Sequence, residues 1–325
     1  MERKFYAKIL LFGEYSLMTG SMALTLPFTG QRGWLTFPED ATGQGGWLTF
    51  PENSAGGRVG RASGQARYSG QALRKFWRFL SRPSAPLPFP EILDLDRFAK
   101  DLDNGLYFES DIQSGYGMGS SGALTAAVYH RYARKPAADV KAGDAVQLQK
   151  LKDLFAAMEG HFHGQSSGID PLTSYMELPL LVESPDSVRI VKVPASGQNE
   201  EGAFYLRDTG LQRKTSPLVS LFQEKYTDEH FKKIFHAEYV PLNNRCISAV
   251  LDGEGQQLET HMRQLSALQL RIFREMIPEH LIAEWKQGVK SGTHSMKLCG
   301  AGGGGYILVY SNRNPGGGCI PIHLP

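Results

Sequence analysis

The chain is poor in the features that mark several protein classes. Only 3 of its 325 residues are cysteine, and Cys246, Cys299 and Cys319 form no CxxC pair, which argues against a disulfide framework or a zinc site. No apolar run approaches the ~18 residues of a membrane helix, and the N-terminal apolar segment is too short for a signal peptide. The formal net charge is only +2, which argues against a dedicated nucleic-acid binder. These absences predict a cytoplasmic protein that uses neither membrane nor nucleic acid as a partner.

Glycine, in contrast, is abundant, with 36 residues that gather in clusters. They follow no three-residue period, which excludes a collagen-like chain. One cluster surrounds a repeated heptapeptide, GWLTFPE, at Gly33–Glu39 and Gly46–Glu52. Two copies are too few for a solenoid. We expect a local duplication in a surface hairpin, within a long mobile loop over residues 30–66.

Apolar periodicity predicts a mixture of strands and helices. Strands are expected at 5–12, 106–112, 188–193 and 203–206 and on both sides of a glycine turn within 297–310. Helices are expected at 71–80, 120–133, 144–163 and 255–276, with another opening at Ser216 as N-cap and Pro217. Closely spaced prolines exclude helix from Ser81–Pro90. Because strands and helices do not alternate regularly, the order favours an α+β fold.

A glycine-rich turn, SGYGMGSSG at Ser114–Gly122, joins an expected strand to an expected helix. Glycines let backbone N–H groups approach a ligand closely, and a helix N-terminus attracts anions. The turn therefore suits phosphate groups. Ser120 and Ser121 would either cap the helix or, for one of them, ligate Mg²⁺. A Walker A motif is absent, and the GxGxxG pattern in this turn lacks the acid-terminated second strand of a dinucleotide site.

The segment EGHFHGQSSGID carries several acidic and imidazole groups at a helix end. Glu159 is either a surface carboxylate or part of a site. His161 and His163 do not converge on a helix, which disfavours a metal site made by this pair. A hydrolase elbow centred on Ser166 would need a preceding strand rather than a helix. Asp170, which precedes a proline, is expected in an extended conformation, either as a fixed carboxylate or as a turn residue.

A second glycine-rich loop, KLCGAGGGGY, lies near the C-terminus at residues 297–306. Each glycine in regular structure costs roughly 0.5–1 kcal/mol relative to alanine. Apolar strand residues flank this run directly, which argues against a flexible linker. The loop is predicted to lie very close to another group.

Three segments then stand in a recognisable order: KILLFGEYSLMTG, SGYGMGSSGALTAA and KLCGAGGGGYILV, with EGHFHGQSSGID between the last two. This set resembles the GHMP kinase superfamily and, within it, the mevalonate kinase family, especially its bacterial branch with the sequence GEY. The resemblance runs from about residue 5 to residue 309.

The resemblance implies two α+β halves, residues 1–185 and 186–325, with ATP, Mg²⁺ and substrate in the cleft between them. It implies that Asp170 takes the proton of the substrate hydroxyl and that Lys8 stabilises charge beside it. Mg²⁺ would be held by Ser121 and Glu159. The phosphates of ATP would be held by Ser114, Gly115, Gly117, Gly119, Ser120, Ser121 and Gly122. The substrate would be bound by Glu14, Tyr15, His163, Gly302 and Gly303.

The implied reaction is phosphorylation of mevalonate to 5-phosphomevalonate in isoprenoid biosynthesis, by a cytoplasmic monomer or homodimer. Three features depart from the family pattern. Tyr15 stands where better-known mevalonate kinases have histidine, the GWLTFPE repeat lies where the family has sheet, and the tail after Tyr306 lacks the usual further helix and strand, so the second half is expected to be incomplete at its end. Alternatives are phosphomevalonate kinase or another GHMP kinase, a catalytically inactive nucleotide-binding protein, and a hydrolase using Ser166.

Overall fold

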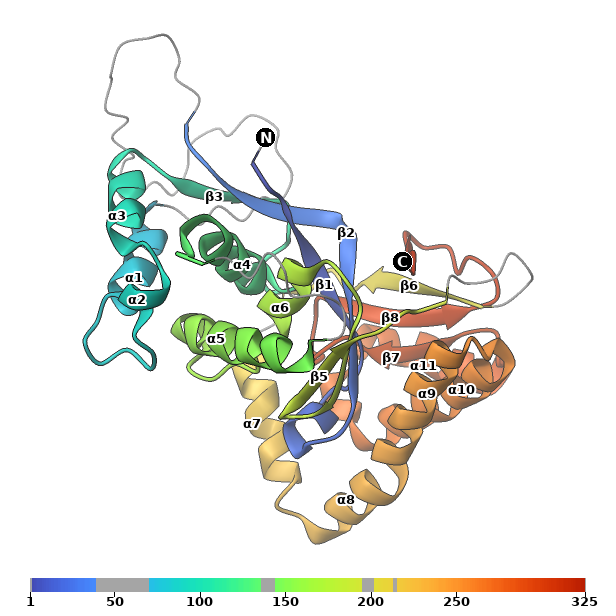
Figure 1. The fold of residues 1–325 in the computed structure, drawn as a ribbon. Helices are drawn as coiled ribbons and strands as arrows, with labels where there is room; N and C mark the ends of the chain where they lie inside the picture. The colour runs from blue at the N-terminus through green and yellow to red at the C-terminus, as the bar shows by residue number, and fades with distance from the viewer. Residues whose placement is uncertain (1, 39–69, 136–143, 195–201, 213–214, 325) are drawn as a thin grey trace.

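The computed structural model describes residues 2–38, 70–135, 144–194, 202–212 and 215–324. These residues form two antiparallel sheets surrounded by helices (Figure 1). The first sheet contains β1 (Phe5–Phe12), β2 (Ala23–Thr36), β3 (Tyr107–Ser110), β4 (Leu180–Ser184) and β5 (Ser187–Ile190). The second contains β6 (Ala203–Asp208), β7 (Ser295–Leu298), β8 (Tyr306–Ser311) and β9 (Ile320–Pro321), in the order β7-β8-β6-β9.

Strand β1 has the bounds expected from its apolar run and lies almost wholly in the core. It pairs with the long strand β2, which also pairs with β4 near its start and with β3 near its end. Lys8 is the one charged residue of β1 and is only 7% exposed. A charge so deeply buried requires a partner of opposite charge. The surroundings of Lys8 are therefore a candidate location for a functional site.

The expectation of a loop over residues 30–66 is wrong at its beginning. Residues 30–36 belong to β2, and Gly33–Thr36 pairs with β3. Gly33 serves packing here, because a Cβ at this position would lie 2.3 Å from the Phe108 ring. The second GWLTFPE copy and its surroundings lie outside the described residues.

Six helices among the described residues accompany the first sheet. They are α1 (Gly70–Leu80), α2 (Phe89–Ile92), α3 (Leu95–Asp103), α4 (Ser120–Tyr132), α5 (Ala145–His163) and α6 (Ile169–Met176). Both α4 and α6 pack on β1 and β2. The expectation that prolines keep helix out of residues 81–90 is wrong at its end, because Pro90 lies in the first turn of α2, where no backbone N–H donor is required.

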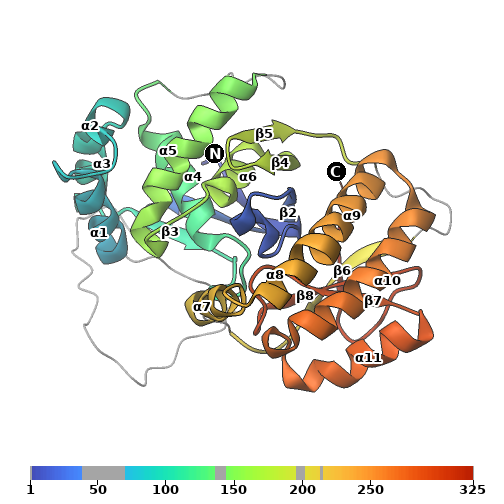
Figure 2. The same ribbon diagram turned by 90° about the horizontal axis from the view of Figure 1, so that it is seen from below.

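Helices α10 (Gly255–Ile272) and α11 (Ile282–Ser291) pack on β7 of the second sheet, and α9 (Val240–Asp252) packs on α10 (Figure 1). In Figure 2, α7 (Thr215–Lys225) and α8 (Glu229–Ile234) lie at the junction between this half and the first. A π-helical segment, Phe235–Tyr239, joins α8 to α9 just before Pro241. Proline cannot donate to the turn before it, which accounts for the irregular turn at this point. No helix in the described ranges combines the length and apolar character of a membrane span.

The two sheets divide later in the chain than residue 185. Strands β4 and β5 form a hairpin on either side of that residue, and both belong to the first sheet. We therefore propose a boundary after β5. The C-terminal segment also contains a strand that the sequence did not predict. This strand, β9, pairs with β6 at the edge of the second sheet.

Candidate functional site

The glycine turn before α4 has the predicted strand–turn–helix context. Gly115, Gly117 and Gly119 have φ angles of 79°, 73° and 75°, which glycine adopts without strain. Gly119 is the N-cap residue and no side chain caps the helix, so Ser120 and Ser121 do not take that role. The buried hydroxyl of Ser120 has no hydrogen-bond partner among the described residues. The start of α4 therefore presents uncapped N–H groups and a free hydroxyl, as an anion site would.

Lys8 and Asp170 form an ion pair that lies against this turn. The Lys8 Nζ lies 2.9 Å from Asp170 Oδ1, with side-chain exposures of 8% and 32%. The Lys8 backbone N–H donates to the Met118 carbonyl at 2.9 Å. A Cβ on Gly119 would lie 2.9 Å from Lys8 Cγ and 3.6 Å from Asp170 Oδ2. Glycine thus allows the turn to lie directly against the ion pair.

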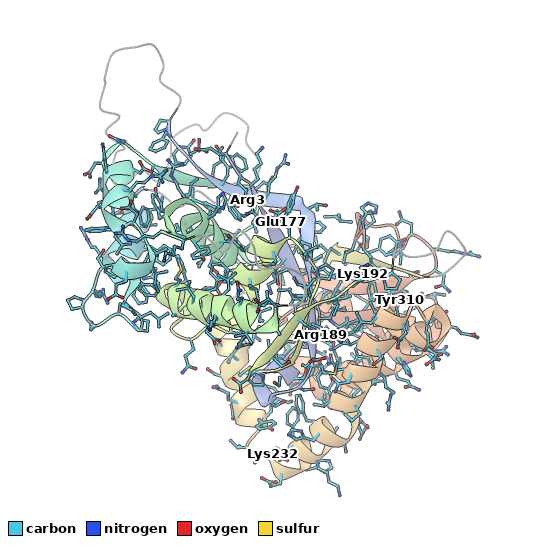
Figure 3. All side chains as sticks on the ribbon, in the orientation of Figure 1. Arg3, Glu177, Arg189, Lys192, Lys232 and Tyr310 are labelled. Carbon is cyan, nitrogen blue, oxygen red and sulfur yellow. The ribbon has the colours of Figure 1, made fainter. Side chains whose placement is uncertain are left out.

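The expectation that Asp170 is extended is wrong. It lies in the first turn of α6, and the following Pro171 is tolerated there because the first helical N–H groups need no intrahelical acceptor. The C-terminal end of α6 forms an ion pair with the segment just before β1, since Arg3 Nη2 lies 3.0 Å from Glu177 Oε1 (Figure 3). Each end of α6 thus carries an ion pair, the Lys8–Asp170 pair at its start and the Arg3–Glu177 pair at its end.

A second polar cluster adjoins the first. Ser121 Oγ donates to Glu159 Oε1 at 2.9 Å, and Ser166 Oγ donates to Glu159 Oε2 at 2.5 Å. His163 Nε2 lies 2.9 Å from Ser121 Oγ. Since the single proton of Ser121 goes to Glu159, we assign the Nε2 proton to His163, which then donates to Ser121.

Glu159 is not a surface residue, because it is only 3% exposed. Burial, together with the nearby Asp170 charge, raises the pKa of its carboxyl to about 7. The serine hydroxyls and Lys8 act in the opposite direction. A positive charge close to Glu159 would therefore stabilise the ionised form of its carboxyl group.

The alternative chemistries of this segment do not match the geometry. The hydroxyl of Ser166 donates to a carboxylate, and no histidine in the described part of the chain is hydrogen-bonded to it, unlike a hydrolase nucleophile. His161 packs between the rings of Phe76 and Phe79 and does not converge with His163. Among the described residues, no three His, Cys, Asp or Glu side chains form a metal-binding group. All strand pairs among the described residues are antiparallel. A dinucleotide-binding βαβ unit requires parallel strands, so this arrangement is incompatible with one.

The C-terminal glycine loop lies against several parts of the protein, as predicted. A Cβ on Gly305 would lie 2.7 Å from the Tyr116 carbonyl oxygen, so the two glycine loops touch. A Cβ on Gly303 would lie 2.6 Å from Leu218 of α7, and one on Gly302 would lie 2.5 Å from the Met276 carbonyl oxygen. The Gly303 N–H already donates to that carbonyl at 2.6 Å. These glycines are thus explained by close packing within the protein.

Two residues of the first motif contact the same loop. Glu14 and Lys297 form an ion pair with an O–N distance of 2.5 Å, and both side chains are 0% exposed. Burial raises the pKa of the Glu14 carboxyl, although Lys297 acts against this rise. Tyr15 is 5% exposed and its hydroxyl donates to the Ala301 carbonyl at 2.7 Å.

The predicted site residues therefore fall into two groups. Lys8, Ser121, Glu159, His163 and Asp170 gather beside the phosphate-type turn. Glu14 and Tyr15 are instead engaged with the C-terminal loop. Sequence reasoning missed Ser166 as a partner of Glu159, although the polar turn that follows the histidines was a signal for it.

Comparisons agree with this arrangement. Residues 92–177, which include the turn and helices α4 to α6, match the family model described as GHMP kinases N terminal domain. No curated protein is significantly similar to the chain.

Three solved structures show the similarity over nearly the whole chain. L. major mevalonate kinase in complex with R-mevalonate is 15% identical, with 97% of this chain and 88% of that chain covered and a TM-score of 0.60. Streptococcus pneumoniae phosphomevalonate kinase in complex with phosphomevalonate and AMPPNP is 15% identical, with 97% and 93% covered and a TM-score of 0.59. Lactococcus lactis galactokinase complexed with galactose is 14% identical, with 95% and 84% covered and a TM-score of 0.54. The chain thus has the two-lobed α+β fold of the GHMP kinases, carries a match to their N-terminal domain at residues 92–177, and resembles mevalonate kinase.

Proposed function

We propose that this chain is an ATP-dependent kinase that transfers a phosphoryl group to the primary alcohol of mevalonate. The observation that carries the proposal is the Lys8–Asp170 pair, 2.9 Å apart, directly beneath the glycine turn of α4. Phosphoryl transfer requires bound phosphates, an oriented hydroxyl and a group that accepts its proton. The turn and this ion pair supply groups for each requirement within one small region.

In this proposal each residue has a distinct task. The N–H groups at the start of α4 and the free Ser120 hydroxyl bind the ATP phosphates. Asp170 accepts the proton of the acceptor hydroxyl while the oxygen attacks the γ-phosphorus. The Lys8 ammonium, 2.9 Å from Asp170 Oδ1, stabilises the negative charge on that oxygen. Both side chains are held by rigid elements, β1 and α6, which favours accurate orientation.

The residues of the second cluster fit Mg²⁺. This cation prefers oxygen ligands and is often held by one or two carboxylates together with substrate phosphates. Glu159 and Ser121 offer such oxygens, and burial makes the Glu159 carboxylate unfavourable without a nearby cation. When bound, Mg²⁺ would neutralise phosphate charge. Ser166 orients Glu159 and His163 orients Ser121 through their hydrogen bonds to these two ligands.

Mevalonate is the proposed acceptor because two of the similar structures contain mevalonate or phosphomevalonate in a related fold. Phosphomevalonate is the second candidate, favoured by Tyr15 in the first motif. An assay of ADP release with mevalonate, phosphomevalonate, galactose and homoserine separates the possibilities. Turnover with mevalonate alone supports the proposal, and turnover with another alcohol alone would reassign the substrate. ATP binding without turnover on any acceptor would indicate an inactive nucleotide-binding protein.

The role of Asp170 is tested by Asp170→Asn. We expect kcat to fall by roughly 10²–10⁴-fold, the range for loss of a general base, with ATP binding retained. Asp103→Asn is a matched control, because Asp103 forms a surface ion pair with Arg74 in which its side chain is 69% exposed. It should leave kcat unchanged. A fully active Asp170→Asn variant would remove Asp170 from the reaction.

A further inference from the structure

Tyr15 has an unusual backbone conformation for a residue with a side chain. Its φ angle is 60°, and only one other non-glycine residue among those described, Glu177, has a positive φ. Residues with a side chain seldom adopt this conformation, and they do so where the surroundings impose it. The next residue begins a short 3-10 helix, Ser16–Thr19. The strained backbone turns the tyrosine toward the other half of the molecule.

Both ends of the Tyr15 side chain are fixed by the C-terminal half. The ring stacks on Phe222 of α7 with a centroid distance of 4.5 Å, and it lies 5.2 Å from the Phe273 ring. The hydroxyl donates to the carbonyl of Ala301, which lies between two glycines of the C-terminal loop. The ring therefore sets the position of the hydroxyl, and the hydroxyl holds the loop.

This hydrogen bond differs from two other anchors of the loop. The N–H groups of Gly303 and Gly305 donate at 2.6 Å to the carbonyls of Met276 and Leu211, which belong to the same half as the loop. Tyr15 follows β1 and so comes from the other half. It ties the loop to the half that carries the phosphate-type turn, and the two glycine loops then touch at Gly305 and Tyr116.

We propose that Tyr15 is a positioning residue, whose hydroxyl holds the C-terminal glycine loop in place against the phosphate-binding turn. The proposal deepens the kinase function proposed above and rests on it for its catalytic consequence. It replaces the expected role of Tyr15 as a direct acceptor contact. Its structural part, the tether from Tyr15 to Ala301, is independent of the substrate.

The tether is tested with Tyr15→Phe, which keeps the stacked ring and removes only the hydroxyl. Hydrogen exchange of the backbone amides in residues 300–305 should become about tenfold faster, as expected for loss of one buried hydrogen bond. Exchange in β1 and α4 should not change. Unchanged exchange in the loop overturns the proposal. Faster exchange spread equally over β1, α4 and the loop also overturns it, because that result shows general destabilisation.

The catalytic consequence is measured on the same variant. We expect kcat to fall about tenfold while the KM for ATP stays within about twofold, because the phosphate-binding turn itself is intact. Tyr226→Phe is the matched control: its hydroxyl contacts His236 at 2.6 Å, and its ring stacks on the same Phe222, but the bond does not reach the glycine loop. This control should change neither exchange in the loop nor kcat. If no acceptor is phosphorylated by any form of the protein, the kinase proposal fails while the exchange result still decides the tether.

Discussion

At the scale of single residues, Glu159 has unusual electrostatics for a carboxyl group. Its carboxylate is 3% exposed and accepts hydrogen bonds from Ser121 and Ser166. These bonds favour the charged form, yet burial and the Asp170 charge dominate and raise its pKa to about 7. The sequence indicated a carboxylate at the end of a helix but could not show this burial, which depends on how α4 and α6 pack beside it.

The raised pKa predicts that stability depends on pH near neutrality. The ordinary pKa is 4.5 and the folded-state value is about 7, so between these values the folded protein holds a proton that the unfolded chain has lost. The free energy of unfolding should therefore decrease as pH rises through this window, by up to about 1.4 kcal/mol per pH unit for one proton. Urea unfolding at several pH values without divalent cations measures the slope.

Glu159→Gln should remove this contribution, because the amide remains neutral. Without divalent cations the variant should be more stable than the natural protein at about pH 8, where the natural carboxylate is charged and buried. Glu183→Gln is the control, since the hydrogen bond from Arg189 lowers the pKa of that exposed carboxyl and keeps its titration away from neutrality. If Glu159→Gln retained the natural slope, the titrating group would lie elsewhere.

At the scale of elements, apolar pattern and glycine position predicted most of what positions the site. Strand β1 and helices α4 and α5 have nearly the expected bounds. The errors have physical causes. The glycines in residues 30–36 indicated a loop but accommodate the Phe108 ring within a strand. Proline at 171 indicated an extended residue before it, but the tight packing of α6 on α4 overrides that local preference.

The contact between α4 and α6 predicts a specific steric effect at Gly122. A Cβ there would lie 2.8 Å from the carbonyl carbon of Asp170, so Gly122→Ala must displace the start of α6. We expect a loss of about 1–3 kcal/mol in stability, as for other overpacked sites, and a fall in the proposed kinase activity as Asp170 moves. Urea unfolding and the ADP-release assay measure the two effects.

Gly160→Ala in α5 is the matched control for this substitution. Gly160 is also helical, but an added Cβ would meet nothing within 4 Å. The usual helix preference should then make this variant about 0.5–1 kcal/mol more stable, with activity unchanged. Equal behaviour of the two alanine variants would show that the α4–α6 contact does not determine where Asp170 lies.

At the scale of the whole molecule, the two halves are joined by polar contacts that no local sequence pattern reveals. Glu14, near the N-terminus, forms an ion pair with Lys297, near the C-terminus. The hydroxyl of Tyr239 donates to the Glu14 carbonyl at 3.0 Å. The family resemblance predicts that Glu14 and Tyr15 bind the substrate, and that assignment stays a prediction. Motif order alone did not indicate that these residues also contact the third motif. The folded chain brings the first motif against the third.

The buried pair at this junction predicts a strong coupling between the two halves. Glu14 and Lys297 are both 0% exposed, so removing one charge leaves the other buried without compensation. Glu14→Gln and Lys297→Met should each cost about 3–5 kcal/mol of unfolding free energy. The double variant should cost much less than the sum of the two, because neither charge then remains.

A double-mutant cycle in urea measures this coupling, with the surface pair Arg74–Asp103 as control. That pair is 2.8 Å apart but 42% and 69% exposed, and its coupling should not exceed about 1 kcal/mol. Strict additivity at Glu14 and Lys297 would show that the two groups do not act as a pair across the junction. A large coupling at these two residues alone would show that the contact between the first and third motifs stabilises the assembled protein as well as shaping its site.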